Sequence, residues 1–141
     1  MKTILLVGGA IFHDDKLLVI QKSDYKKIFA WHWEIPGGKV EDEEDPNDTL
    51  IREIKEETNL DVEILRPYNV WHDIMEINGE KEHLVEIDFL MNAKNIDDIK
   101  LEEHKHPNYK WIKREDIPTP MTKEMKATII KAFDSILKKD L

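Results

Sequence analysis

The chain has 141 residues, which suits a single domain with a buried core, and we expect residues 1–141 to fold as one unit. It carries 30 acidic and 21 basic residues, for a formal net charge of −9, and this excess of negative charge argues against a surface that follows nucleic-acid phosphates. Cysteine is absent, which excludes disulfides, zinc–thiolate sites and a cysteine nucleophile and is compatible with a cytoplasmic location.

Two apolar runs at the start of the chain predict a β-hairpin. Thr3–His13 and Lys16–Gln21 are strand-like and are joined at Asp14-Asp15. We interpret the first run as a buried strand rather than a signal peptide, because it continues directly into the second. No segment reaches the ~18 apolar residues that a membrane-spanning helix requires, so we expect no membrane partner.

A polar loop, Lys22–Ala30, and a segment rich in tryptophan follow the hairpin. If the segment from Trp31 to Pro36 is extended, Trp31 and Trp33 point to the same side. Because tryptophan is on average strongly buried, we expect the two rings to pack in the core or at its edge.

The region from Gly37 to Leu60 contains a well-marked helix. Asp45 followed by Pro46 is typical of a helix start, with an N-cap acceptor and a proline at the first helical position. At the other end, Asn59 suits the left-handed conformation that terminates a helix. Between the caps, a face to bury is predicted from the residues that recur at helical spacing, namely Leu50, Ile51, Ile54 and Thr58.

Another face of this helix concentrates negative charge. Glu53, Glu56 and Glu57 stand at i, i+3 and i+4, and like-charge neighbours at this spacing destabilise a helix by roughly 0.2–0.5 kcal/mol a pair. A divalent cation would remove the conflict, and ligands that offer only oxygen favour Mg²⁺, with Mn²⁺ as a substitute, over Zn²⁺. Taken alone, such a cluster is more often a solvated acidic face.

The wider pattern resembles the Nudix box, the signature of the family that includes MutT. Gly38, Glu44 and the run Arg52-Glu53-Ile54-x-Glu56-Glu57-x-x-Leu60 fill most of the fixed positions of a 23-residue pattern. Two positions depart from it: Asn59 stands where the family usually has glycine, and Glu43 replaces a frequent glycine. Asn is the commonest substitute for Gly in left-handed backbone, so the first departure is physically tolerable.

The rest of the chain completes an α+β fold. Asn78-Gly79 is a strong hairpin signal, and two helices on opposite faces of a mixed sheet make a three-layer α/β/α sandwich, the fold that the resemblance also implies. The predicted elements after the box are strands at Val62–Pro67, Tyr68–Ile77 and Lys81–Met91, an acidic loop at Asn92–Pro107, a short strand at Tyr109–Ile112 and an amphipathic helix at Thr122–Lys138.

The resemblance implies a metal-dependent hydrolysis. Nudix enzymes use water to cleave a nucleoside diphosphate that is linked to another group, and cations lower the barrier by neutralising phosphate charge. Carried over residue by residue, the implied metal ligands are Glu53, Glu56, Glu57 and the carbonyl of Gly38, and Glu53 is also a candidate general base.

Further residues take supporting roles by the same resemblance. Arg52 orients the carboxylates with Glu44 as its partner, and Lys39 lies where it approaches the phosphates or the nucleophile. Family members often take one more carboxylate from a late loop, and here we choose Glu103 over Glu102. The six histidines show no metal-ligand spacing, and His104 and His106 are expected in a solvated loop.

Substrate choice stays open among three readings. We prefer a MutT-like nucleoside triphosphate pyrophosphohydrolase that releases a monophosphate and pyrophosphate. The alternative is an enzyme that hydrolyses ADP-ribose or another nucleoside diphosphate derivative. The third is a domain that binds a nucleotide without hydrolysing it. Ile117–Met121 lacks a clear asparagine to read an oxidised guanine, so 8-oxo-dGTP is not assigned. Lys22, through a phosphate, and Trp33, through base stacking, are candidate contacts to the small-molecule nucleotide.

Overall fold

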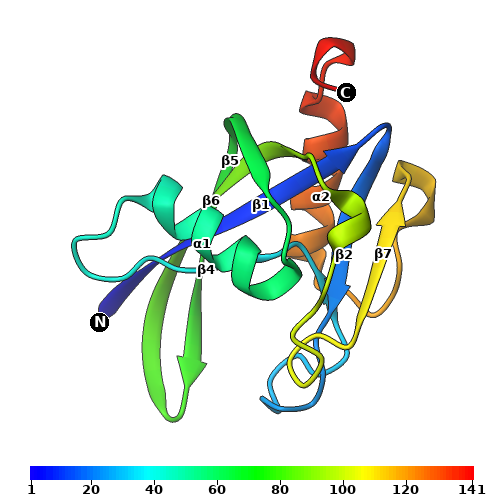
Figure 1. Ribbon diagram of the computed structural model, residues 1–141. Coiled ribbons are helices and arrows are strands. Elements are labelled where there is room, and N and C mark those ends of the chain that lie inside the picture. The colour runs from blue at the N-terminus through cyan, green and yellow to red at the C-terminus, as the bar shows by residue number, and fades with distance from the viewer.

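The structure is a computed structural model that describes all 141 residues, and Figure 1 shows a twisted sheet with two main helices. The helices are α1 (Pro46–Thr58) and α2 (Lys123–Ser135), with short 3₁₀ turns at Ile96–Asp98, Arg114–Asp116 and Lys138–Asp140. The strands are β1 (Lys2–His13), β2 (Lys16–Gln21), β3 (Trp33–Glu34), β4 (Gly37–Lys39), β5 (Val62–Ile77), β6 (Glu80–Ala93) and β7 (Asn108–Ile112).

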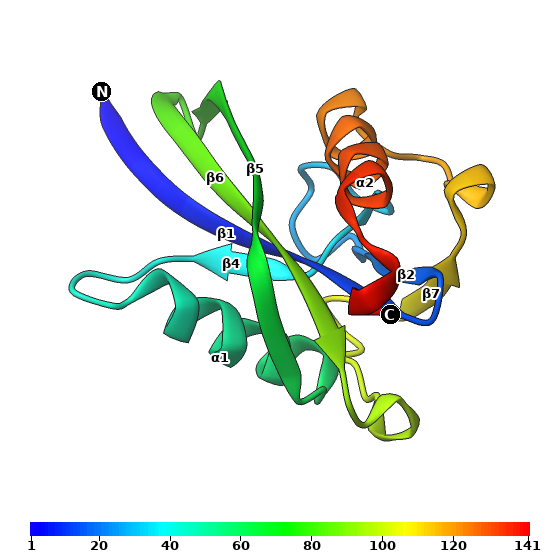
Figure 2. The same ribbon diagram turned by 90° about the horizontal axis from the view of Figure 1, so that it is seen from above.

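Strand β1 is the centre of the seven-stranded sheet. The main order is β3-β2-β1-β6-β5, with β4 paired to β1 and β7 paired to β2. The pairing of β1 with β6 is parallel and the others are antiparallel, so the sheet is mixed as predicted. Seen from above, α1 and α2 lie on opposite faces of the sheet (Figure 2), which confirms the three-layer α/β/α arrangement.

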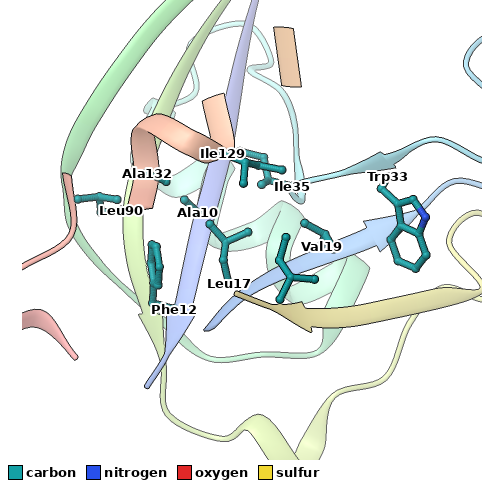
Figure 3. Packing of buried hydrophobic residues seen from close by; sticks show 10 residues of the cluster. Ala10, Phe12, Leu17, Val19, Trp33, Ile35, Leu90, Ile129 and Ala132 are labelled. Atoms are coloured by element: carbon teal, nitrogen blue, oxygen red, sulfur yellow. The ribbon is translucent and has the colours of Figure 1, made fainter. Parts of the chain in front are cut away.

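Alternation along β1 supplies both layers of the core. Ala10 and Phe12 belong to the cluster under α2, where Ile129 and Ala132 of that helix pack against the sheet (Figure 3). Val7 and Ile11 point to the other face and join the cluster under α1: Leu18, Ile20, Leu50, Ile54, Leu60, Phe89 and Met91. The sheet therefore holds α1, with its acidic residues, firmly against β1.

The predicted extent of α1 is correct, but the predicted buried face includes one residue too many. Leu50, Ile54 and Thr58 are fully buried, whereas Ile51 is 44% exposed. Residues four apart share one stripe of a helix, and Ile51 lies about 100° around the axis from Leu50, on the side away from the sheet.

The paired tryptophans of the sequence separate in the structure. Trp33 enters β3 and is 6% exposed, but Trp31 is 46% exposed, so the core assignment is right for one ring and wrong for the other. The segment before β3 is not extended: Phe29 and Trp31 both have positive φ, at 53° and 64°. The alternation rule for strands therefore does not apply to Trp31.

The two strands predicted between residues 62 and 77 form one strand, β5. It pairs with β6 along its length, with irregularities between Ile64 and Arg66 and between Pro67 and Asn69. Such bulges, together with the position of β5 at the sheet edge, accommodate a proline that cannot donate a hydrogen bond. The turn that follows is the expected one, with φ of 52° at Asn78 and 79° at Gly79.

The closing helix is shorter than predicted. Helix α2 begins after the N-cap Thr122 and ends at Ser135 rather than Lys138, because Ile136 is extended with φ −69° and ψ 139°. Neither helix has the length and apolar composition needed to cross a membrane.

Candidate active site

Both ends of α1 are capped as the sequence predicts. The Asp45 side chain accepts a hydrogen bond from the Asn47 N–H at 2.8 Å. Asn59 has φ 63°, its N–H donates to the Lys55 carbonyl, and its Nδ2 donates to the Asp98 carbonyl at 3.0 Å. These caps fix where the helix starts and stops, and so fix which way its glutamates project.

Arg52 connects three of the glutamates. Its Nε and Nη2 donate to the two carboxylate oxygens of Glu44, both at 3.0 Å, and its Nη1 donates to Glu53 at 3.2 Å and to Glu56 at 3.3 Å. The Thr49 hydroxyl adds a hydrogen bond to Glu44 at 2.6 Å. The hydrogen bonds from Arg52 and Thr49 lower the pKa of Glu44 to about 2, so Glu44 stays ionised. The predicted contact between Arg52 and Glu44 is present.

Glu57 occupies a different environment from its neighbours. It is only 8% exposed, and one carboxylate oxygen accepts the Gly37 N–H at 3.0 Å. Burial raises the pKa of Glu57 well above its ordinary value, and the nearby charge of Glu34 raises it further. Glu57 therefore differs from Glu44, Glu53 and Glu56, which accept hydrogen bonds from Arg52.

Gly38 lies against the Glu53 side chain. A Cβ atom at this position would come within 2.4 Å of the Glu53 carboxyl carbon, so any larger residue would displace that carboxylate. Burial also raises the pKa of Glu53, with the Arg52 charge opposing the shift. The glycine of the box is thus needed for space beside the glutamate.

His106 and Glu34, which the sequence does not indicate as site residues, lie beside Glu57 in the structure. His106 is 4% exposed, which contradicts the expected solvated loop, and its Nε2 lies 3.1 Å from a carboxylate oxygen of Glu34. Its Nδ1 is 3.8 Å from a Glu57 oxygen and has no hydrogen-bond partner. Sequence spacing carries no signal for this contact, because His106 and Glu57 are 49 positions apart and meet only through the fold.

The late loop brings Glu102 rather than Glu103 toward the box. The charge of Glu102 contributes to the raised pKa of both Glu53 and Glu57. Glu103 is solvent-exposed and contributes to neither. Glu102 is therefore the residue of this loop whose charge acts on the site, and the assignment of Glu103 as a metal ligand stays a prediction.

A cavity of about 460 Å³ opens beside the box. Its wall includes Gly38 and Lys39, and Lys22 and Trp33 line it as well. The Lys22 ammonium group donates to the Ile28 carbonyl at 3.4 Å, and the Trp33 ring lies 4.9 Å from the Lys110 ammonium group. With 6% exposure, Trp33 presents little of its face to the cavity.

The donor set fits a hard divalent cation. Glu53, Glu56 and Glu57 offer only carboxylate oxygen, and Arg52 is a single positive charge shared by three carboxylates that do not include Glu57. No three such side chains already converge to metal-binding distances. A bound cation would therefore redirect the Glu53 and Glu56 side chains from Arg52.

Comparison with known proteins identifies the family. The NUDIX domain model matches residues 3–133, nearly the whole chain. The chain belongs to the Nudix family. It is accordingly a Nudix hydrolase, that is, a pyrophosphohydrolase, and the family generally depends on divalent metal ions.

Several relatives of the chain are named for nucleotide substrates. It is 31% identical over 118 residues to the CTP pyrophosphohydrolase of Escherichia coli, a match that spans 82% of this chain and 80% of that one. It is 36% identical over 61 residues to the 8-oxo-dGTP diphosphatase of Proteus vulgaris. That match spans 43% of this chain and 54%, about half, of the relative. A solved MutT Nudix hydrolase from Burkholderia pseudomallei aligns with a TM-score of 0.79 and 26% identity, over 97% of this chain and all of the other.

Both departures from the Nudix box keep the backbone that glycine usually provides. Asn59 and Glu43 have φ of 63° and 64°. Left-handed backbone costs an ordinary residue roughly 1–2 kcal/mol, so the box turn at Glu43 is held by its surroundings rather than by local preference.

Proposed function

We propose that this Nudix hydrolase cleaves nucleoside triphosphates to a nucleoside monophosphate and pyrophosphate, with Mg²⁺ as its cation and Mn²⁺ as a substitute. The observation that carries the proposal is that Gly38 and Lys39 belong to the wall of a cavity and that Gly38 also lies against the Glu53 carboxyl group. The volume of about 460 Å³ falls within the range of small-molecule sites, and we place a nucleoside in it with the phosphates toward the box.

The residues divide the work as follows. Glu53, Glu56, Glu57 and the Gly38 carbonyl would hold the cation, which supplies Lewis-acid neutralisation of phosphate charge when bound. Arg52 and Glu44 orient the helix carboxylates, and their double hydrogen bond keeps the guanidinium fixed.

Water adds to a phosphorus of the bond between the α- and β-phosphates, and the bridging P–O bond breaks. One proton of that water passes to a base, for which Glu53 is our choice, because it lies against Gly38 at the cavity wall. Lys22 and Lys39 line the same cavity and are assigned to the phosphates. A cytoplasmic location stays a prediction from the absence of cysteine.

A panel of substrates tests the proposal. Nucleoside triphosphates, 8-oxo-dGTP, ADP-ribose and a UDP-sugar are incubated with Mg²⁺, and products are identified by ³¹P NMR. We expect the highest kcat/KM with a triphosphate and pyrophosphate as the product. Preferential cleavage of ADP-ribose or the UDP-sugar would reject the triphosphate assignment in favour of a nucleoside diphosphate derivative.

A further inference from the structure

The cavity beside the box combines an apolar wall with half-buried carboxyl groups. Apolar side chains line most of it, including Leu6 of β1, Trp71 of β5 and Leu84 of β6. Glu86 of β6 also lines it, and the same residue borders a smaller space of about 160 Å³ next to Gly37 and Gly38. The carboxyl group of Glu86 therefore sits where the cavity meets the box.

Glu86 is fixed in place by its neighbours. The parallel register of β1 and β6 sets Gly8 beside Asp88, and a Cβ at Gly8 would lie 2.6 Å from Asp88 Oδ1 and 3.2 Å from Glu86 Oε2. Only glycine at this position leaves room for both carboxyl groups on the face of the sheet that carries α2. The Trp71 Nε1–H donates to Glu86 Oε2 at 2.9 Å, and the Asn69 amide donates to Asp88 Oδ2 at 3.1 Å.

One oxygen of this pair of carboxyl groups has no hydrogen-bond donor. Asp88 is fully buried, and its Oδ1 receives no hydrogen bond from the rest of the protein. Burial raises the pKa of Glu86 well above its ordinary value, and the neighbouring Asp88 carboxyl group raises it further. A proton held by Glu86 would give Asp88 Oδ1 its missing donor, and the lone pairs that Glu86 offers the cavity accept hydrogen bonds.

We propose that the cavity receives the nucleobase of the substrate and that the Glu86 carboxyl group selects bases with an exocyclic amino group, namely cytosine, adenine and guanine. This inference rests on the proposed function for the identity of the ligand. An amino group donates to the acceptor that Glu86 presents, whereas the 4-carbonyl of uracil or thymine places an acceptor against an acceptor. A buried polar group left unpaired costs binding energy, and this is how polar pockets reject close analogues.

Binding without turnover tests the inference directly. Dissociation constants of CMP, UMP and the 2-pyrimidinone analogue of CMP, which has hydrogen in place of the 4-amino group, are measured by calorimetry in EDTA. We expect CMP to bind about tenfold or more tightly than either of the others, a difference of about 1.4 kcal/mol or more, since each of the others leaves the acceptor of Glu86 unpaired. Equal affinities for the three ligands, or no measurable binding of any, would overturn the inference.

Variants of Glu86 locate the effect. Glu86→Met removes the acceptor at similar length and should bring CMP affinity down to that of the analogue. Glu86→Gln keeps an acceptor toward the cavity and a donor toward Asp88, so it should retain the preference. The control is Glu80→Met, the same change at an exposed position of the same strand. A preference for CMP that persists in Glu86→Met, with the fold verified by its melting curve, would contradict the assignment.

Hydrolysis separates this inference from the proposed function. If CMP is preferred through Glu86 but no triphosphate is cleaved, the triphosphate activity fails and the base assignment stands. If CTP and UTP are cleaved with equal kcat/KM, the activity stands and the base assignment fails.

Discussion

Two clusters of carboxyl groups in this protein place like charges close together, but in different surroundings. Glu53 and Glu56 of α1 and Glu44, just before the helix, share the guanidinium of Arg52, and its hydrogen bonds lower the pKa of Glu44. On β6, Glu86 and Asp88 receive hydrogen bonds from the neutral groups of Trp71 and Asn69, and burial raises the pKa of Glu86.

The difference explains what each group is able to do. Carboxylates that have a cation nearby keep their charge and are available to bind another cation, whereas burial raises the pKa values of a pair whose hydrogen-bond donors are neutral. Glu57 lies between the two cases. It belongs to the Nudix box but is buried, with Gly37 and His106 rather than Arg52 beside it, so it gains most from an added cation.

Removal of divalent cations should have the largest effect on the box group. We expect turnover to disappear in excess EDTA, because a protein of net charge −9 and a polyphosphate would otherwise repel at the site. The melting temperature should also rise with added Mg²⁺, since a ligand that binds the folded state stabilises it. Turnover and melting curves are measured with and without EDTA, and undiminished turnover with the chelator would contradict the metal role.

Single box glutamates should have the next largest effect. Glu56→Gln and Glu57→Gln should each lower kcat by roughly 10²–10⁴-fold, because a metal ligand is worth several kcal/mol and about 1.4 kcal/mol corresponds to a factor of ten. Glu63→Gln, an exposed glutamate on β5, is the matched control. Steady-state kinetics at saturating Mg²⁺ decide the point; wild-type rates in both box variants would remove these residues from the metal site.

The pH dependence of stability should distinguish the β6 pair. A folded-state pKa raised above the unfolded value gives stability that is present at low pH and is lost as pH rises through the folded pKa. Above pH 4.3, roughly the pKa of an unfolded glutamate, the free energy of unfolding of the wild-type protein in EDTA should therefore fall relative to that of Glu86→Gln. The fall should be up to about 1.4 kcal/mol per pH unit.

The comparison is made by urea unfolding between pH 5 and 8. Glu44 does not affect this comparison. Because its pKa is lowered, its contribution to the free energy of unfolding changes only below this pH range. The difference between the two proteins should grow with pH. A constant difference would mean that Glu86 is ionised in the folded protein.

Substitution of Asn59, the C-cap of α1, should have the smallest effect. Asn59→Val should destabilise the fold by about 1–2 kcal/mol, because a β-branched side chain is strained at φ 63°. Asn59→Gly should be nearly neutral, since the relief of strain offsets the lost hydrogen bond to the Asp98 carbonyl. Metal affinity should fall with stability in the Val variant. Equal melting temperatures for Val and Gly at this position would show that the backbone conformation there is not limiting.

Local chemistry explains which parts of this structure were predictable. The caps at Asp45 and Asn59 and the turn at Asn78-Gly79 depend on residues within a few positions of each other, and the structure has all of them. The pairing of Arg52 with Glu44 followed from the family pattern and is present in the structure. Ile51 and Trp31 were misplaced because their exposure depends on how the segment meets the sheet.

The remaining site residues come together only through the tertiary fold. His106 reaches Glu34 of β3 and Glu57 of α1 through the fold, and no spacing in the sequence indicates these contacts. Glu86 and Asp88 are two positions apart and share a face of β6, a spacing that the sequence does show. Their contacts with Trp71 and Asn69 depend on the register of β5 and β6. Glu102 and Glu103 are adjacent in the sequence, and only the fold shows that the charge of Glu102 acts on Glu53 and Glu57.

The most direct test of the account is the hydrolysis of the best triphosphate of the panel in ¹⁸O-labelled water with Mg²⁺, followed by ³¹P NMR of the products for wild type and Glu57→Gln. We predict nucleoside monophosphate and pyrophosphate in equal amounts, one ¹⁸O in one of the two, and a rate reduced by roughly 10²–10⁴-fold in the variant. Formation of nucleoside diphosphate and orthophosphate, or a rate that Glu57→Gln leaves unchanged, would contradict it.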